Sequence, residues 1–297
     1  MPTASTLLAE ELFASGDPGF LAALYDVQVP RGTEQVKGWG GKPYDLPTRF
    51  ARKPQKAHPL GIFAKRWLED PRPWARDQLR QYIADGCDRP GHRTLVKRLY
   101  KGVEDRGDQE LLALFVVSFD RLRRMRVRTR KVYDWSTRRV VESQRIEDFK
   151  PRTPGVLHFS QRTRNYLQAR VARHVRMLGT HDPAAYRRTV LEALCRYEDK
   201  DFPAGHALPR MRSLVSLLFA HSDVFFRVGR RIDLASGKTL ADLAPAPHHA
   251  AAWKVASAEL FDALLRARSL FVRRQLVRWL ERDFVAATGV TPEPSMR

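Results

Sequence analysis

The chain is poor in cysteine and has no long apolar run. Its two cysteines, Cys87 and Cys195, lie far apart in the sequence and form no CxxC pair. A disulfide framework and a cysteine-based zinc finger are therefore excluded, and the pattern indicates a reducing compartment. No apolar stretch approaches the roughly 20 residues that a membrane-spanning helix needs, and the N-terminus lacks the basic segment of a signal peptide. We expect a cytoplasmic protein without a membrane partner.

The motifs of common catalytic sites are also missing from the sequence. It contains no HExxH and no G-x-S-x-G, and its nine histidines are scattered, with only His248 and His249 adjacent. Gly237 to Thr239 end as a phosphate-binding loop does, but Ile232 occupies the position of that loop's first glycine. We therefore predict no metal and no cofactor, expect no small-molecule ligand, and favour a role that is not enzymatic.

Acidic residues are few relative to basic ones. Against 33 Asp and Glu the chain has 53 Lys and Arg, which gives a formal net charge of +20 and a pI near 10.6. Only 12 of the 53 are lysine, so 41 are arginine, the side chain best suited to bidentate phosphate contacts and to stacking on bases. A GC-rich genome enriches arginine over lysine, but it does not explain the excess of cations. The charge predicts nucleic acid or an acidic protein as partner.

Two regions of helical periodicity flank a region of alternation. Apolar residues recur every three or four positions from about residue 58 to residue 124 and again after residue 160, whereas residues 26–59 show no sustained period. Residues 126–146 alternate, which predicts helices around an inserted β-hairpin. A second small hairpin is expected to turn at Ser236-Gly237. The predicted domains are an N-terminal helix and extended arm (1–59), a first helical-repeat segment (60–125), the inserted basic hairpin and linker (126–159), a second helical-repeat segment (160–287) and a flexible tail (288–297).

Three stretches of the chain look like one another. They are WLEDPRPWARDQLRQYI (67–83), LFAHSDVFFRVGRRI (218–232) and LLRARSLFVRRQLVRWL (264–280). Each ends one helix with an apolar pair, turns through polar residues, and begins the next segment with an apolar residue directly before an arginine. The stretch at 218–232 departs from the other two after that arginine, so its second helix is expected to be short or absent.

This pattern resembles the HEAT-like helical repeats, whose second helix typically opens with a Val-Arg pair after a short polar turn. The chain is also similar to uncharacterised HEAT-like proteins of GC-rich bacteria, a likeness that brings no known activity. The resemblance implies a mainly α protein, a divergent right-handed α-solenoid of stacked helix pairs. In that frame Arg76, Arg227 and Arg273 are expected to pair with carboxylates or helix ends in the turns.

Two basic runs are candidates for contact with a polyanion. The first, Arg121 to Lys131, has seven cations in eleven residues, beside aromatic residues that can stack on bases. The second places arginines of residues 161–176 on one helix face. Both also have a plain interpretation as solvated or protein-binding surface, and cations suit a helix C-terminus. The predicted nucleic-acid-binding residues are Arg121, Arg123, Arg124, Arg126, Arg128, Arg130, Lys131, Tyr133, Trp135, Arg162, Arg173 and Arg176.

Our leading hypothesis is a non-enzymatic scaffold whose basic face binds nucleic acid through its backbone, with RNA or single strands favoured. A first alternative is an adaptor for an acidic protein partner. A second is an enzyme, either a HEAT-like DNA glycosylase or a metal-dependent nuclease that uses Asp134, Asp148 and Lys150. Carboxylates more than about 8 Å apart cannot share a metal ion, so their separation tests the nuclease hypothesis.

Overall fold

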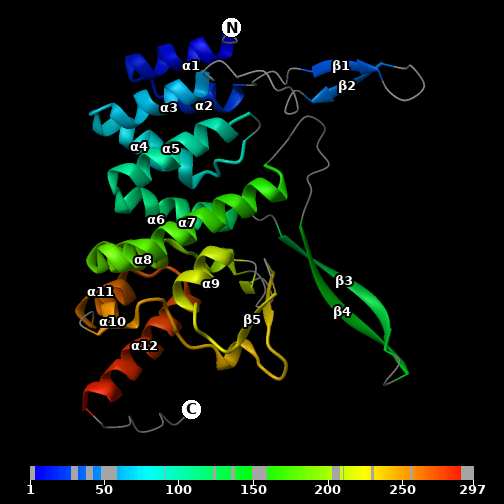
Figure 1. The fold of residues 1–297 in the computed structure, drawn as a ribbon, viewed down its shortest axis with the longest axis vertical. Helices are drawn as coiled ribbons and strands as arrows, with labels where there is room; N and C mark the ends of the chain where they lie inside the picture. The colour runs from blue at the N-terminus through cyan, green and yellow to red at the C-terminus, as the bar shows by residue number, and fades with distance from the viewer. Residues whose placement is uncertain are drawn as a thin grey trace. The chain divides into compact units, whose positions relative to one another are not determined.

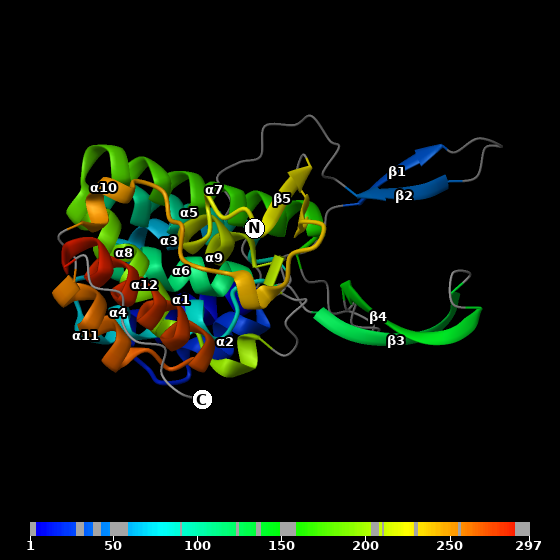
Figure 2. The same ribbon diagram turned by 90° about the horizontal axis from the view of Figure 1, so that it is seen from below.

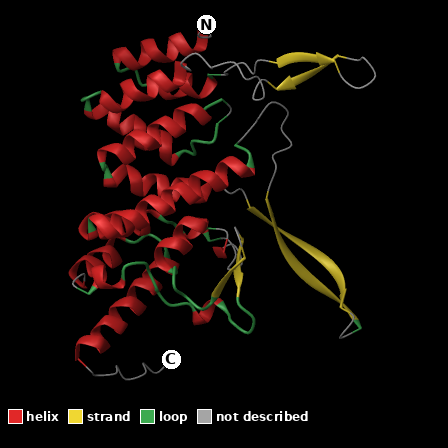
Figure 3. Cartoon of the chain, viewed as in Figure 1, coloured by secondary structure: helices red, strands yellow, loops and turns green. Residues whose placement is uncertain are grey.

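The protein is mainly helical, as the sequence predicts. The computed structural model describes residues 4–27, 33–37, 43–47, 59–89, 91–122, 125–134, 138–148, 159–202, 208–209, 211–228, 231–254 and 257–288. Within these ranges the chain forms twelve α-helices and three separate two-stranded antiparallel hairpins (Figure 3). None of the helices in the described ranges is long and apolar enough to cross a membrane.

The chain divides into two compact units. Unit 1 comprises Met1–Arg106 and Gly155–Phe159, and unit 2 comprises Gly107–Pro154 and Ser160–Arg297. The boundary therefore falls between two helices inside the segment 60–125, at a different place from the segment boundaries predicted from the sequence.

Unit 1 is built around an aromatic core. Its helices are α1 (Ala4–Ser15), α2 (Phe20–Asp26), α3 (Pro59–Glu69), α4 (Pro73–Ala84) and α5 (Arg93–Arg106) (Figure 1). Helix α3 packs against α1, α4 and α5. The ring of Phe13 lies 5.1 Å from those of Phe20 and Phe63 and 6.0 Å from that of Trp67, between ring centroids. These buried rings join the first three helices.

Arg72 connects the start of α4 to the end of α1. Pro73 occupies the first turn of α4, where a missing N–H does no harm, and Arg72 is the residue before it. Its guanidinium donates to the carbonyl oxygens of Phe13 (2.8 Å) and Ala14 (3.0 Å) in the last turn of α1. The Asp70 carboxylate accepts from the same guanidinium at 2.7 Å, and this contact lowers the pKa of Asp70.

The predicted arm contains a hairpin that the sequence analysis missed. Strands β1 (Thr33–Lys37) and β2 (Pro43–Pro47) pair antiparallel, with Thr33 opposite Pro47 and Lys37 opposite Pro43. Five-residue strands are too short for alternation to stand out. Their prolines are tolerated because both strands of an isolated pair are edges.

Unit 2 is arranged around helix α6. Its helices are α6 (Gln109–Arg121), α7 (Gln161–His181), α8 (Pro183–Arg196), α9 (Arg212–Leu218), α10 (Ala250–Trp253), α11 (Ser257–Arg266) and α12 (Leu270–Thr288), with 3-10 turns η2 (Asp199–Asp201) and η4 (Leu240–Asp242). Helix α6 packs against α7, α8 and α9 (Figures 1 and 2). Asp108 caps α6 by accepting from the N–H of Leu111 at 3.1 Å, and every residue from Leu111 to Asp120 is buried.

The long hairpin of unit 2 confirms the strand prediction for residues 126–146. Strands β3 (Met125–Asp134) and β4 (Arg139–Asp148) pair over their whole length. The second hairpin exists, but its predicted turn is wrong. Strands β5 (Phe225–Val228) and β6 (Arg231–Leu234) flank residues 229–230, and Gly237 (φ 73°) belongs to a later turn. Strand β5 also stands where a HEAT-like repeat would begin its second helix.

Candidate nucleic-acid interface

Helix α7 is strongly basic and carries no acidic residue. Ser160 caps it, accepting from the N–H of Thr163 at 3.3 Å. Its 21 residues include five arginines and two histidines but no Asp or Glu. The helix therefore lacks the acidic partners at i±3 or i±4 that usually offset arginine charge on a helix surface.

Three of these arginines share the exposed side of α7. Arg162, Arg173 and Arg176 are exposed, whereas Leu167 and Val171 on the opposite side are fully buried. We call the exposed row formed by Arg162, Tyr166, Ala169, Arg173 and Arg176 the α7 stripe; all five side chains are exposed. Over the 14 steps from Arg162 to Arg176 the helix rises about 21 Å at 1.5 Å per residue. The structure thus brings together the three arginines that the sequence predicted on this helix.

The other two arginines of α7 are engaged within the protein. Arg164 is buried, and its Nη1 donates to the carbonyl of Leu122 at 3.4 Å. Arg170 is half-buried and donates to the hydroxyl of Tyr166 at 3.3 Å. Only part of the basic run is therefore available to a partner.

A small cationic pocket adjoins one end of the α7 stripe. It has a volume of about 220 Å³, and Arg173 and Arg176 belong both to its wall and to the stripe. Arg212 from the first turn of α9 and His248 complete its basic lining. No acidic residue is among the described residues that line it, which are Gln168, Ala169, Ala172, Arg173, Arg176, Arg212, Ser216, Ile232 and His248.

A buried carboxylate, Asp120, fixes two parts of this pocket. Its oxygens accept from Nε2 of Gln168 (2.9 Å) and from the N–H groups of Ser213 (3.0 Å) and Leu214 (2.9 Å), next in the chain after Arg212. The hydroxyl of Tyr197 donates to it as well, at 3.0 Å. Burial raises the pKa of the Asp120 carboxyl, and the hydrogen bonds from α9 and Tyr197 act in the opposite direction. Asp120 therefore holds Gln168 and the start of α9 in place.

His248 is positioned by contacts around the end of α7. The carbonyl of His248 accepts from the hydroxyl of Tyr186 at 3.1 Å, and its ring lies 4.9 Å from that of His221. The next residue, His249, has a left-handed backbone (φ 56°). Its ring Nε2 lies 2.7 Å from the carbonyl oxygen of Arg176, so this histidine joins the loop to α7.

Sequence reasoning missed Arg212 and His248. They come from a seven-residue helix and a loop, and they meet α7 only in the folded chain. No spacing in the sequence connects them to Arg173 and Arg176. The adjacent pair His248-His249 is visible in the sequence, but it does not indicate an arginine-lined pocket.

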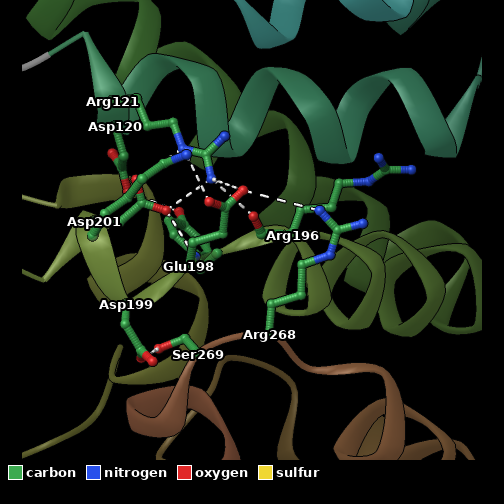
Figure 4. Close-up of polar contacts among 10 residues, drawn as sticks. Asp120, Arg121, Arg196, Glu198, Asp199, Asp201, Arg268 and Ser269 are labelled. Carbon is green, nitrogen blue, oxygen red and sulfur yellow. Dashed lines mark hydrogen bonds and ion pairs between the residues drawn. The ribbon is translucent and has the colours of Figure 1, made fainter.

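Arg121, one of the predicted residues, has partners within the protein. Its Nε and Nη2 each donate to a carboxylate oxygen of Asp201 at 2.8 Å, and Nη2 also donates to the carbonyl of Arg196 at 3.0 Å (Figure 4). Glu198 lies 3.5 Å from the same nitrogen. The guanidinium thus joins the end of α6 to the segment after α8. Arg121 therefore belongs to an ion-pair network within the protein, with partners that are distant from it in the sequence.

The β3–β4 hairpin carries the remaining predicted residues. Across it Arg126 pairs with Glu147, Arg128 with Arg145 and Arg130 with Ser143, so two of the three arginine positions oppose no acidic position. Lys131 and Tyr133 are exposed. Arg123, Arg124 and Trp135 lie outside the residues that the structure describes.

The same register excludes the proposed nuclease site. Asp148 pairs with Met125, and Asp134 lies nine residues further along β3. At about 3.3 Å per residue the two aspartates are about 30 Å apart, too far to share a metal ion. Lys150 lies outside the described residues. Within the described part of the chain no three His, Cys, Asp or Glu side chains are grouped to hold a metal.

Three arginines of the last helix have structural partners. Nε of Arg273 donates to the carbonyl of Ala267 at 2.7 Å, at the end of α11, in agreement with the expectation for this residue. Arg278 donates to the carbonyl of Leu243, and Arg282 to that of Pro245 at 2.7 Å. These contacts hold Leu243 and Pro245, which precede α10, against α12.

Comparisons with protein-family models, with curated proteins and with solved structures find no match to this chain.

Proposed function

We propose that the protein is a non-enzymatic helical scaffold that binds the backbone of nucleic acid, with RNA or single strands as its preferred partners. The observation that carries this proposal is the α7 stripe. Three exposed arginines lie on one side of a helix that has no acidic residue. Arginine at such a surface forms charge-assisted, bidentate contacts with phosphate.

The length and composition of the stripe fit a strand of nucleic acid. Its rise of about 21 Å is long enough to contact several successive phosphates of one strand. Tyr166, 42% exposed, lies between Arg162 and Arg173 on the stripe, and an exposed ring of this kind stacks on unpaired bases. Unpaired bases are accessible in single strands, which is why the proposal favours them over a duplex.

We further propose that the helices of each unit are stacked as divergent HEAT-like repeats. In support, α3 packs against α5, and in unit 2 α6 packs against α8 and α7 against α9. Contact between every second helix is typical of stacked helix pairs. Native-state hydrogen exchange tests this: opening should proceed helix pair by helix pair, and one cooperative opening of a whole unit would contradict it.

The binding proposal is tested by fluorescence anisotropy with labelled single-stranded and double-stranded DNA and RNA over a salt series. In the stripe variant Arg162, Arg173 and Arg176 are all changed to Gln. Losing three phosphate contacts should weaken binding and make the slope of log affinity against log salt less steep by about two to three, because each contact contributes about 0.7 to 0.9.

The matched control removes the same charge elsewhere. Arg93, Arg98 and Arg274 are exposed residues of other helices, and their joint change to Gln should leave the slope nearly unchanged. A variant with Arg126, Arg128 and Arg130 changed to Glu measures the contribution of the β3–β4 hairpin to the binding affinity. Equal losses in the stripe and control variants would mean attraction by net charge alone, and would overturn the proposal.

A further inference from the structure

The pocket at the end of the α7 stripe has the properties of a binding site for a single anionic group. Its volume of about 220 Å³ is below the roughly 300 to 1,000 Å³ of pockets that enclose a whole small molecule. Small side chains, Ala169 and Ala172, leave the space open, and Gln168 and Ser216 add neutral polar groups. A group of this size enters while the rest of its molecule stays outside.

The charge of the lining matches a dianion better than a monoanion. Three guanidinium groups and one histidine line the space, and none of the described lining residues is acidic. A phosphate monoester carries a charge of about −1.5 to −2 at pH 7 and three acceptor oxygens. The phosphodiester within a strand carries a single charge and has chain on both sides, so it fits an exposed stripe better than a recess.

The pocket is also held in shape before any ligand arrives. Gln168 and the first turn of α9 are both hydrogen-bonded to the buried carboxylate of Asp120. The His249 ring also contacts the carbonyl of Arg176 and keeps the chain beside His248 close to α7. Preorganised donors lose little freedom on binding, which favours affinity for a small group.

We infer that this pocket binds a phosphate monoester, and that in a bound strand it receives the terminal phosphate. The inference rests on the proposed function for the strand, because Arg173 and Arg176 belong both to the stripe and to the pocket. A strand that lies along the stripe from Arg162 ends at the pocket. The protein therefore distinguishes phosphorylated strand ends from hydroxyl ends. A free nucleotide offers the same monoester and is the other source of this ligand.

The test uses the full chain and fluorescein-labelled single-stranded RNA of eight nucleotides in three forms. One has a 5′-phosphate, one a 3′-phosphate and one hydroxyl groups at both ends, and all three carry the label on the same internal base. One phosphorylated form should bind about tenfold more tightly than the hydroxyl form, because the monoester gains charge-assisted contacts. Adenosine monophosphate and inorganic phosphate, added as competitors, should reduce the affinity of that form to that of the hydroxyl form.

Two single variants separate the pocket from the stripe. Arg212→Gln changes the pocket but not α7, and should abolish the preference for phosphate while leaving the hydroxyl strand's affinity unchanged. Arg162→Gln changes the far end of the stripe, and should weaken all three forms by the same factor. Ser216→Asp places a negative charge in the pocket and should reproduce the Arg212→Gln result, in case the latter variant does not fold.

The outcomes separate the inference from the function on which it rests. If all three strands bind equally and neither competitor has an effect, the inference is overturned while the proposed function stands. If the mononucleotide binds and no strand does, the monoester site is supported and the proposed function fails. A phosphate preference that persists in both pocket variants would place the site elsewhere and overturn the inference.

Discussion

Acid is expected to destabilise unit 1 through one buried histidine, His92. Its side chain is fully buried between α4 and α5, and its Nδ1 lies 2.9 Å from the hydroxyl of Tyr82. Burial, assisted by the positive charge of Arg89, lowers the pKa of His92 from 6.5 to about 4. The folded chain therefore keeps this ring neutral at a pH where the unfolded chain protonates it.

The sign and size of the effect follow from linkage. Between pH 6.5 and about 4 the unfolded state binds more protons, so the free energy of unfolding falls as the pH falls, and it is constant above 6.5. The interval of about 2.5 pH units, at 1.36 kcal/mol for each unit, gives a loss of about 3 kcal/mol by pH 4. This is a large part of the stability of an ordinary domain.

Hydrogen exchange of peptides from α4 and α5, corrected for intrinsic exchange rates, measures the opening free energy of this region between pH 4 and 7. The control is His92→Asn, which keeps a polar group near the Tyr82 hydroxyl and does not titrate. Acidic residues that titrate in the same range affect both chains alike, so the difference between the chains isolates His92. Equal pH slopes in the two chains would refute the reasoning.

Two further predictions concern unit 2. Asp120→Ala leaves four buried donors without their acceptor, and we expect urea denaturation to show a loss of at least about 3 kcal/mol, whereas Asp199→Ala, at an exposed site, should cost less. Gly179→Ala brings a methyl group against the ring of His249, which should destabilise the chain by about 1 to 3 kcal/mol. Most of that loss should vanish when Gly179→Ala is combined with His249→Ala, and additive losses would contradict the contact.

The sequence predicts elements well where a pattern is local and long. The ten-residue strands of the β3–β4 hairpin alternate enough to be recognised, and the apolar spacing of α6 and α7 is unmistakable. The β1–β2 hairpin is too short to show a period. The sequence predicts the turn of the β5–β6 hairpin at Ser236-Gly237. Gly237 does adopt a positive φ, but it belongs to a later turn, because a glycine with positive φ serves several kinds of turn.

Long-range partners limit what the sequence says about the candidate site. Arg162, Arg173 and Arg176 share a face because one helix carries them. Arg212 and His248 join them only through tertiary contacts. Arg121 belongs to the densest basic run, yet its partner Asp201 lies 80 residues away in the sequence. The role of an arginine depends on whether a distant carboxylate reaches it, and local spacing does not encode that.

The arginines that donate to main-chain carbonyls have a consequence for how this protein responds to its surroundings. Arg273 and Arg278 hold separate segments together by donating to backbone carbonyl oxygens. A carbonyl is neutral and a guanidinium stays charged up to a pH above about 12. These hydrogen bonds therefore do not change with pH below about 12. Salt screens them little, because the accepting carbonyl carries no charge. Part of the chain's positive charge thus belongs to arginines that stabilise the fold. Their donors are engaged within the protein, but their charge still contributes to the electrostatic field around it.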